Sequence, residues 1–183
     1  HLITLARLGI GKFTIADPYY FEAANMNRQY GARVNTLGQT KAEVMAAEVR
    51  QINPEVELRI FGNGISPETV VDFMAGADLF IDGIDFFSID MRRRLFRQAA
   101  ANGIHAITAG PMGFSTAWLT FEPHGMSFDR YFDLNDQQEE IDQLIAFAVG
   151  LAPKLLHRPY IDLNKVSLTE RRGPSSAIAC QLC

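Results

Sequence analysis

Expected strands and helices alternate along the first part of this 183-residue chain, and this rhythm limits the possible folds more than any other feature. The first strand is expected at Lys12–Asp17, as a buried strand, after a helical segment that Gly9 ends. The segments after it are a helix from Thr40 to about Ile52, a strand over 56–61, a helix starting at Ser66-Pro67-Glu68, a strand over 77–81, a helix over 90–101 and a strand over 105–108. Such alternation predicts an α/β fold, Rossmann-like and doubly wound, with a mostly parallel sheet.

The later part of the chain has a different pattern. Polar and apolar residues alternate over 116–122, which is typical of a half-exposed, antiparallel strand. A helix is expected over 136–150 and a loop over 159–176. We therefore expect a nucleotide-binding α/β core over 1–122 and a C-terminal extension of the same domain over 123–183. The core would lack its first strand and a glycine-rich loop, which should precede residue 1.

Composition argues against several classes of protein. The net charge of -4 argues against generic nucleic-acid binding, which usually needs a basic surface. The longest apolar run, 144–153, is far shorter than the roughly 20 residues that span a bilayer, so no membrane association is expected. The two cysteines, Cys180 and Cys183, provide no disulfide framework. We expect a cytoplasmic protein without a signal peptide.

Asp17 is the first candidate site residue, because it ends the first expected strand. Ligands of doubly wound sheets bind beyond the carboxyl ends of the strands, where an acid commonly binds a ribose hydroxyl. An acid at a strand end can equally serve only to form a turn.

Two further segments carry groups that suit a phosphate. Residues 25–29 are dense in side-chain amides, and Arg28 offers a planar fork of donors to phosphate oxygens, although a solvated loop has the same composition. Lys41 falls in the first turn of its expected helix, where the helix dipole disfavours a cation unless an anion is bound. Backbone donors and an ammonium there could form a phosphate site, or Lys41 could simply be exposed.

Asp82 and Asp85 follow the strand expected over 77–81 and should face the same crevice. Carboxylates at this place could hold Mg²⁺, or one of them could cap the next helix. Elsewhere, the arginines at 92–94 are expected to form a solvated helix face, and Trp118 and Phe121 to pack. The histidines at 105, 124 and 157 lie singly and suggest neither a triad nor a metal site.

Taken in order, these residues resemble the ThiF/MoeB family of activating enzymes over 1 to about 122. The resemblance rests on Asp17, Asn25-Met26-Asn27-Arg28-Gln29, Gly38-Gln39-Thr40-Lys41 and Asp82-Gly83-Ile84-Asp85. It implies ATP and Mg²⁺ as cofactors, with Asp17 on the ribose, Asp85 on the metal, and Asn25, Arg28 and Lys41 at the phosphates. Asn27 and Gln29 would complete the cofactor-binding set.

The resemblance also implies a reaction and partners. The expected activity is adenylylation of the C-terminal carboxylate of a ubiquitin-like or sulfur-carrier protein, catalysed by Arg28, Lys41 and Asp85 through positioning and charge neutralisation. The family usually forms homodimers. A tRNA-modifying dehydratase of the same family, a nicotinamide-dependent oxidoreductase and a non-catalytic interaction module are the alternatives.

Three features depart from the family pattern. Tyr19 stands where a second acid is usual, and Phe86 stands where asparagine is common. Both substitutions favour the non-catalytic alternative. Cys180 and Cys183 form one C-x-x-C pair, whereas a structural zinc site needs two such pairs, so zinc is not expected.

Overall fold

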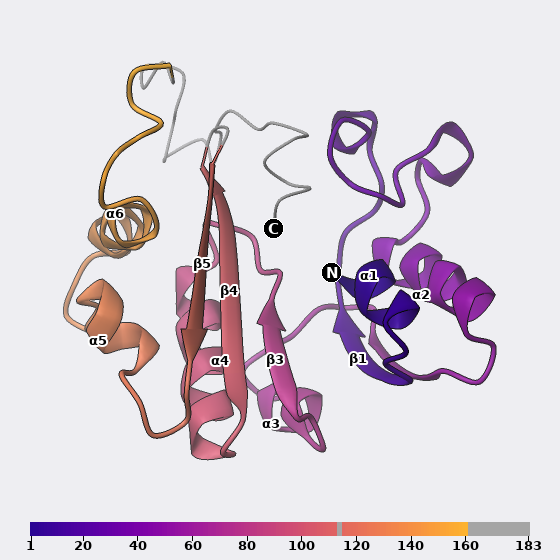
Figure 1. The fold of residues 1–183 in the computed structure, drawn as a ribbon, viewed down its shortest axis with the longest axis horizontal. Helices are drawn as coiled ribbons and strands as arrows, with labels where there is room; N and C mark the ends of the chain where they lie inside the picture. The colour runs from indigo at the N-terminus through magenta and orange to yellow at the C-terminus, as the bar shows by residue number, and fades with distance from the viewer. Residues whose placement is uncertain (113–114, 161–183) are drawn as a thin grey trace. The chain divides into compact units, whose positions relative to one another are not determined.

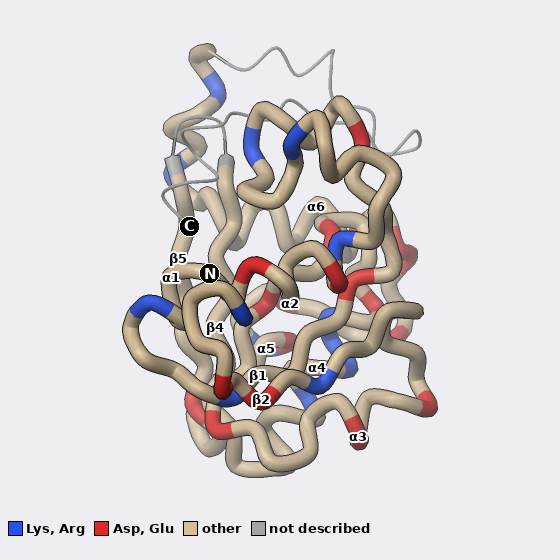
Figure 2. Tube along the Cα trace, turned by 90° about the vertical axis from the view of Figure 1, so that its right-hand side faces the viewer, with Lys and Arg blue, Asp and Glu red and all other residues tan. Residues whose placement is uncertain are grey.

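The computed structural model describes residues 1–112 and 115–160, and the chain divides into two compact units, His1–Ala75 and Gly76–Cys183 (Figure 1). Each unit combines helices with paired strands, so the expected α/β class is confirmed. The division falls inside the predicted core, and the predicted boundary at residue 122 stays a prediction. Acidic and basic residues are interspersed along the trace (Figure 2). None of the described helices is long and apolar enough to cross a membrane.

The first unit is built on a two-stranded parallel sheet. Its elements are α1 (Leu2–Arg7), β1 (Lys12–Ala16), the 3-10 turns η1 (Ala23–Asn25) and η2 (Val34–Thr36), α2 (Lys41–Ile52), β2 (Glu57–Phe61) and α3 (Val70–Met74). β1 pairs with β2 from Lys12↔Glu57 to Ala16↔Phe61. The expectation that β1 is buried is wrong, because its residues are exposed or half-buried in this two-stranded sheet.

The helices of this unit follow their sequence signals with one exception. α2 begins after Thr40, as predicted, and buries its apolar side at Ala42, Val44, Ala46 and Val49. The helix expected from Ser66-Pro67-Glu68 starts later, at Val70. The Thr69 hydroxyl accepts a 2.8 Å hydrogen bond from the Ser66 amide, and this contact closes a turn in place of the first helical turn.

The second unit is a three-stranded sheet in the order β3-β4-β5, packed against helices. Its elements are β3 (Leu79–Asp82), α4 (Ile89–Ala101), β4 (His105–Met112), β5 (Ser115–Phe121), α5 (Phe128–Phe132) and α6 (Glu140–Leu151). β3 and β4 are parallel, and β5 is antiparallel to β4, as predicted. α6 starts later than expected, because the Asn135 and Gln137 amides donate to the side chains of Gln138 and Asn135, at 2.9 and 3.0 Å, and these contacts close a turn before the helix. The expected loop over 159–176 lies almost wholly outside the described residues, as do Cys180 and Cys183.

Phenylalanine rings fill the space between this sheet and its helices. Phe96 of α4 stacks on Phe128 of α5 at 4.2 Å between ring centroids and meets Phe121 of β5 edge-on at 5.3 Å. Phe121 therefore packs as predicted.

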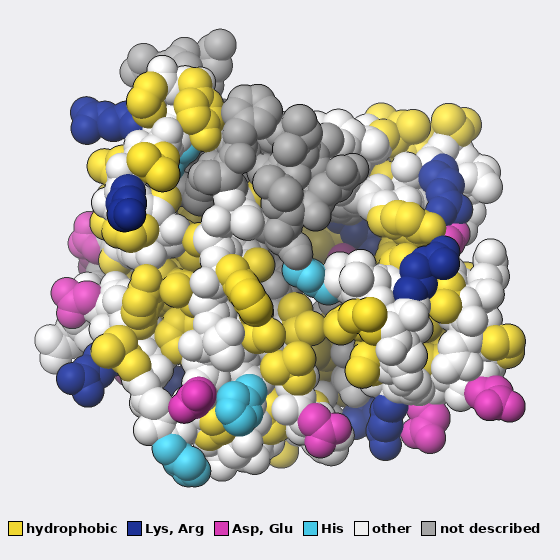
Figure 3. All heavy atoms as spheres, viewed as in Figure 1, with side chains coloured by type: hydrophobic (Ala, Val, Ile, Leu, Met, Phe, Trp, Pro, Cys, Tyr) yellow, Lys and Arg dark blue, Asp and Glu magenta, His cyan; other side chains and the backbone are white. Residues whose placement is uncertain are grey.

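The expectation that Trp118 also packs is wrong, because this side chain is 69% exposed. Side chains alternate along a strand, so Trp118 points to the opposite face of the sheet. Hydrophobic side chains are visible over these strands (Figure 3).

Candidate functional site

The segment after β1 runs antiparallel to the residues that lead into α2. A bridge joins Tyr20 to Thr40, the Phe21 amide donates to the Gln39 carbonyl at 2.9 Å, and the Lys41 amide donates to the Tyr19 carbonyl at 2.9 Å. These contacts bring the end of β1 beside the N-terminus of α2. Two of the predicted site residues, Asp17 and Lys41, are thus connected through Tyr19, whose amide donates to the Asp17 carboxylate and whose carbonyl accepts from the Lys41 amide.

Asp17 directly follows β1 and is half-buried. Its Oδ1 accepts a 2.9 Å hydrogen bond from the Tyr19 amide, so the carboxylate does form a turn, as one of its two interpretations expected. That turn also presents the Tyr19 carbonyl to the Lys41 amide. The structural role of Asp17 is therefore to dock this segment against α2, with its carboxylate at the end of the strand.

Lys41 is the first residue of α2, and its ammonium lies over aromatic rings. The Nζ atom is 5.5 Å from the centroid of the Tyr19 ring and 6.0 Å from that of Phe21, both within the range of a cation–π contact. No carboxylate pairs with this ammonium within the described part of the chain. The nearby Glu43 accepts instead from the Thr40 hydroxyl at 2.6 Å. Lys41 is thus oriented without being neutralised, which suits an incoming anion.

The predicted amide-rich segment folds as η1 and the turns after it. Asn25 is 7% exposed, and its Oδ1 accepts from the Glu22 amide at 3.0 Å, so this side chain stabilises its own turn. Arg28 donates through Nη1 to the Ala24 carbonyl at 2.7 Å and to Asn27 Oδ1 at 3.0 Å. Its Nε and Nη2 have no partner among the residues that the structure describes. Arg28 is therefore anchored at one nitrogen and keeps donors for a ligand. Asn27 is exposed and Gln29 is half-buried.

A small apolar core fixes this segment on α2. Phe21 and Ala32 pack with Val44, and Met45 lies against the cluster. A Cβ at Gly31 would lie 2.6 Å from Phe21 Cζ, so only glycine permits this close approach. The segment that carries Arg28 is thereby attached to α2, the helix that begins with Lys41.

Asp82 and Asp85 have different surroundings in the second unit. Asp82 is 5% exposed, and Oδ2 accepts from Arg92 Nε at 2.8 Å and from Thr108 Oγ1 at 2.7 Å. Its Oδ1 accepts from the Ile84 amide at 3.0 Å, so Asp82 has little capacity left for a metal. Asp85 is exposed, and its Oδ1 accepts from the Phe87 amide at 3.0 Å. Of these two aspartates, Asp85 is the one that presents a carboxylate outward.

One interpretation of the sequence expected one of these aspartates to cap α4, and neither does. The N-cap residue of this helix is Ser88, and the Asp85 side chain closes the turn just before it. The expectation that Asp82 and Asp85 face the same crevice is also wrong. Asp82 ends β3 and its side chain is bound by Arg92 of α4, whereas Asp85 lies in the loop after the strand and is exposed.

The predicted solvated arginine face is wrong for two of its three residues. Arg92 and Arg93 are each 3% exposed, and only Arg94 is half-exposed, where it pairs with Asp90 at 2.8 Å. The helix period contained the signal for this burial. Arg92 lies three residues after Ile89, four before Phe96 and seven before Ala99, and all three of these apolar residues are buried. Such spacing puts Arg92 on the buried face of the helix, and Arg93 lies beside it on the same face.

The exposed carboxylate of Asp85 fits one protein ligand of a magnesium ion. The described residues include no cluster of three or more His, Cys, Asp or Glu that could form an all-protein metal site. Mg²⁺ usually takes only one or two carboxylates and completes its shell with water and substrate phosphates. The outward carboxylate of Asp85 meets that requirement.

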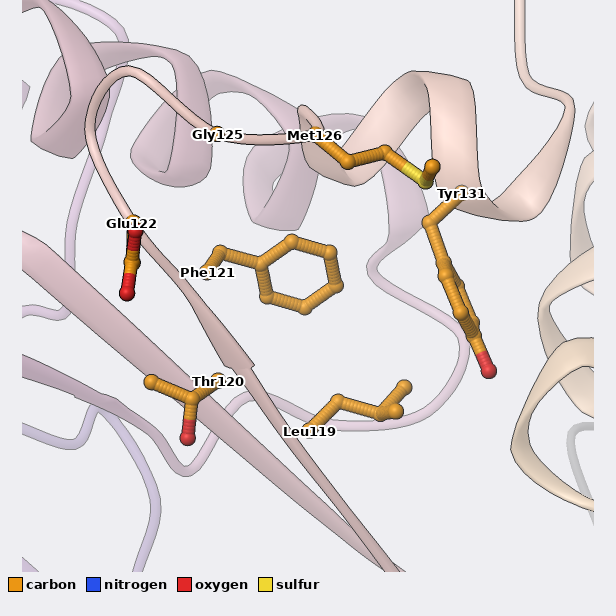
Figure 4. A pocket seen from close by; sticks show the side chains of 7 residues that line it. All are labelled: Leu119, Thr120, Phe121, Glu122, Gly125, Met126 and Tyr131. Atoms are coloured by element: carbon orange, nitrogen blue, oxygen red, sulfur yellow. The ribbon is translucent and has the colours of Figure 1, made fainter.

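A pocket of about 280 Å³ lies at the end of β5 (Figure 4). Its lining is mostly apolar and includes Phe121, Met126 and Tyr131, with Glu122 beside them. Ligand pockets usually measure roughly 300–1,000 Å³. None of the predicted site residues lines this pocket, and it is not the expected nucleotide site.

Known proteins resemble this chain in both sequence and structure. A tRNA threonylcarbamoyladenosine dehydratase of Haemophilus influenzae is 39% identical over 113 residues, which cover 61% of this chain and 42% of that protein. The sulfur carrier protein ThiS adenylyltransferase of Escherichia coli is 25% identical over 119 residues, 65% of this chain and 47% of that protein. The solved structure of the E. coli tRNA N6-threonylcarbamoyladenosine dehydratase in complex with ATP matches with a TM-score of 0.57 and 36% identity, over 61% of this chain and 46% of that chain.

This chain spans less than half the length of each of these relatives. The sequence model of the ThiF family matches residues 1–155, and the chain therefore belongs to the ThiF family.

Proposed function

We propose that this chain is the nucleotide-binding part of an ATP-dependent adenylyltransferase that activates a carboxylate. The observation that carries the proposal is the pairing of the segment after β1 with the start of α2. This pairing joins the Asp17 turn to an oriented, unneutralised Lys41. The ATP complex of the related E. coli dehydratase supports ATP as the nucleotide.

Each predicted residue has a role in this proposal. Asp17 binds the ribose, Lys41 and Arg28 bind the phosphates, and Asp85 holds magnesium, which would supply charge neutralisation at the phosphates. The remaining cofactor-binding residues are Asn25, Asn27 and Gln29.

The reaction begins with a carboxylate oxygen of the acceptor, which attacks the α-phosphorus of ATP. A new oxygen–phosphorus bond forms as the bond to the bridging oxygen breaks, giving an acyl adenylate and pyrophosphate. Lys41 and Arg28 neutralise phosphate charge and fix the geometry of this transfer.

The first candidate acceptor is the C-terminal carboxylate of a ubiquitin-like or sulfur-carrier protein. The name of the E. coli relative, an adenylyltransferase of a sulfur carrier protein, supports it. The second candidate is a modified adenosine in tRNA, because two of the similar proteins are tRNA threonylcarbamoyladenosine dehydratases. A labelling experiment distinguishes these two acceptors. The full-length protein is given α-labelled ATP with each acceptor in turn, and the true acceptor is the one that causes release of labelled AMP.

ATP–pyrophosphate exchange tests the phosphate contacts. Arg28→Ala and Lys41→Ala should each reduce exchange by about 100-fold or more, because each removes a donor to the phosphates. The thermal midpoint should change little in both variants. Arg33→Ala and Lys12→Ala are matched controls, since both are exposed cations, and they pair with Glu48 and Glu57 in place of a ligand. A loss of exchange that only follows a loss of stability would overturn the assignment.

The nucleotide itself is tested by isothermal titration. The full-length protein should bind ATP more tightly than NAD, and magnesium should raise the affinity for ATP. Preferential binding of NAD would favour an oxidoreductase, and binding of neither nucleotide would favour an interaction module.

Homodimerisation is part of the proposal, because a partner subunit could complete the nucleotide site. Sedimentation of the full-length protein should give a dimer. A monomer that is fully active with ATP would contradict it.

A further inference from the structure

Arg92 is a buried cation whose guanidinium is shared between one carboxylate and one loop. Its Nε donates to Asp82 Oδ2 at 2.8 Å, and both side chains are 3% exposed. Its two Nη groups donate to consecutive backbone carbonyls, those of Ile84, Asp85 and Phe86, at 3.2 Å for Asp85 and 3.3 Å for Phe86. One side chain thus holds three successive peptide groups of the β3–α4 loop.

That loop carries Asp85, and its own hydrogen bonds depend on the same shape. The Ile84 amide donates to Asp82 Oδ1, and the Phe87 amide donates to Asp85 Oδ1, each at 3.0 Å. The Arg92 donors fix the carbonyl side of the peptides while these contacts fix the amide side. The outward direction of the Asp85 carboxylate is consequently set from within the unit.

α6 holds the guanidinium from a further side. The Arg92 Cζ atom lies 4.6 Å from the centroid of the Phe147 ring, within the range of a cation–π contact. The same ring meets Phe86 at 5.6 Å between centroids. Phe86, where the family commonly has asparagine, therefore packs the loop onto α6.

Stability alone does not explain an ion pair at this place. Two buried charges lose hydration, and well-packed apolar residues of similar volume are often at least as stabilising. A planar fork that bonds one carboxylate and a series of carbonyls has a geometric function that neither lysine nor an apolar residue reproduces.

We propose that Arg92 is a positioning residue that holds the Ile84–Phe86 loop so that Asp85 meets a magnesium–nucleotide complex. This inference rests on the proposed function, in which Asp85 is the magnesium ligand. Arg92 acts through the loop and makes no contact with the ligand.

Arg92→Lys tests this role, because lysine keeps a positive charge near Asp82 but cannot bond three carbonyls at once. Arg93→Lys is the matched control. Arg93 is the next residue on α4 and equally buried, and its partners are Asp129, Asp136, Asn135 and Gln143, none of which belongs to the loop. Both variants are made in the full-length protein.

Two measurements follow. Amide hydrogen exchange should show faster exchange at Ile84 and Phe87 in Arg92→Lys and unchanged exchange there in Arg93→Lys. The magnesium concentration that half-saturates ATP binding should rise by about 10- to 100-fold in Arg92→Lys, as is typical when a residue that orients a metal ligand is lost, and by less than about twofold in Arg93→Lys.

Equal shifts in the two variants, or a magnesium requirement unchanged in Arg92→Lys, would overturn the inference. If Arg92→Lys fails to fold, the double variant Asp82→Asn/Arg92→Met removes both buried charges and is measured in its place. Magnesium-independent ATP binding by the wild-type protein would instead reject the role of Asp85. The exchange data would then still decide whether Arg92 orders the loop.

Discussion

Individual residues show how this chain accommodates its departures from the family pattern. Tyr19 replaces a second acid, and its ring lies beneath the Lys41 ammonium while its backbone joins Asp17 to α2. An acid there would pair with Lys41, whereas an aromatic ring orients the ammonium and leaves its charge for a phosphate. The departure is therefore compatible with ATP binding.

Tyr19→Phe should retain the ATP affinity of the wild-type protein, because a phenyl ring also attracts a cation. Tyr19→Ala should weaken ATP binding by about 0.5–1 kcal/mol, the size of an exposed cation–π contact. Isothermal titration of both variants measures the difference. Equal affinity in Tyr19→Ala and Tyr19→Phe would exclude this role for the ring.

The two aspartates after β3 should respond differently to the same substitution. Asp85→Asn should fold normally and lose most of the magnesium dependence of ATP binding, since it removes the outward charge. Asp82→Asn should lose about 3–5 kcal/mol of unfolding free energy, because it leaves the Arg92 charge buried and uncompensated. Its ATP binding should still depend on magnesium. Denaturant titration and ATP titration with and without magnesium measure both effects. If Asp82→Asn is the variant that loses magnesium dependence, our placement of the metal is wrong.

At the scale of elements, α4 is connected to its neighbours by charge as well as by aromatic packing. Arg93 and Arg97 both bind Asp129 of α5, at 2.9 and 2.6 Å, and both bind Asp136 in the segment before α6, at 2.8 and 3.0 Å. The hydrogen bond from Arg97, with its charge and that of Arg93, lowers the pKa of Asp136 below its ordinary value of 3.8.

This shift predicts how stability changes in acid. A carboxylate with a lowered folded-state pKa stabilises the fold at pH values above about 3.8, and this contribution disappears as the pH falls through the folded-state pKa. Asp136→Asn should therefore show a smaller loss of thermal midpoint than wild type between pH 5 and pH 2. Asp78→Asn is the control, since Asp78 is exposed and forms no ion pair within the described chain. Identical acid profiles of wild type and Asp136→Asn would contradict the prediction.

The contact between β4 and α6 leaves no room for a side chain at Gly110. A Cβ there would lie 2.7 Å from Leu151 Cδ1, so Gly110→Ala should cost about 1–3 kcal/mol through overpacking. The double variant Gly110→Ala/Leu151→Ala should lose less unfolding free energy than the two single variants together, because the added methyl group occupies space that the Leu151 side chain has left. Gly62→Ala is the control, with no described atom within 4 Å of the added Cβ. Urea unfolding measures these losses of unfolding free energy. If the losses of the two single variants add up in the double variant, residues 110 and 151 are not in steric conflict.

At the scale of the whole molecule, charge bears on the choice between the two acceptors. The net charge is -4, and acidic and basic residues are interspersed along the chain (Figure 2). Nonspecific nucleic-acid binding depends on released counterions and falls steeply with salt. The chain should therefore bind unmodified tRNA with a Kd weaker than about 10⁻⁴ M at physiological salt. Filter binding across a salt series measures this, and tight binding with a steep salt slope would favour the tRNA acceptor.

The sequence by itself determined the fold class and the family of this chain. Strand and helix periodicity correctly placed α2, α4 and the antiparallel β5, because local patterns of apolar residues decide such elements. The ordered polar residues from Asp17 to Asp85 identified the ThiF family, and the family match confirms that resemblance.

Only the tertiary structure decided which polar groups face a ligand and which stabilise the fold. Asp82 and Asp85 are chemically identical and three residues apart, yet Arg92, ten residues beyond Asp82, binds one of them in the interior. The sequence suggested a solvated Arg92 because a charge costs too much to bury without a partner, and its partner lies on a different element. Pairings between distant segments, such as Tyr20 with Thr40, likewise have no local signature.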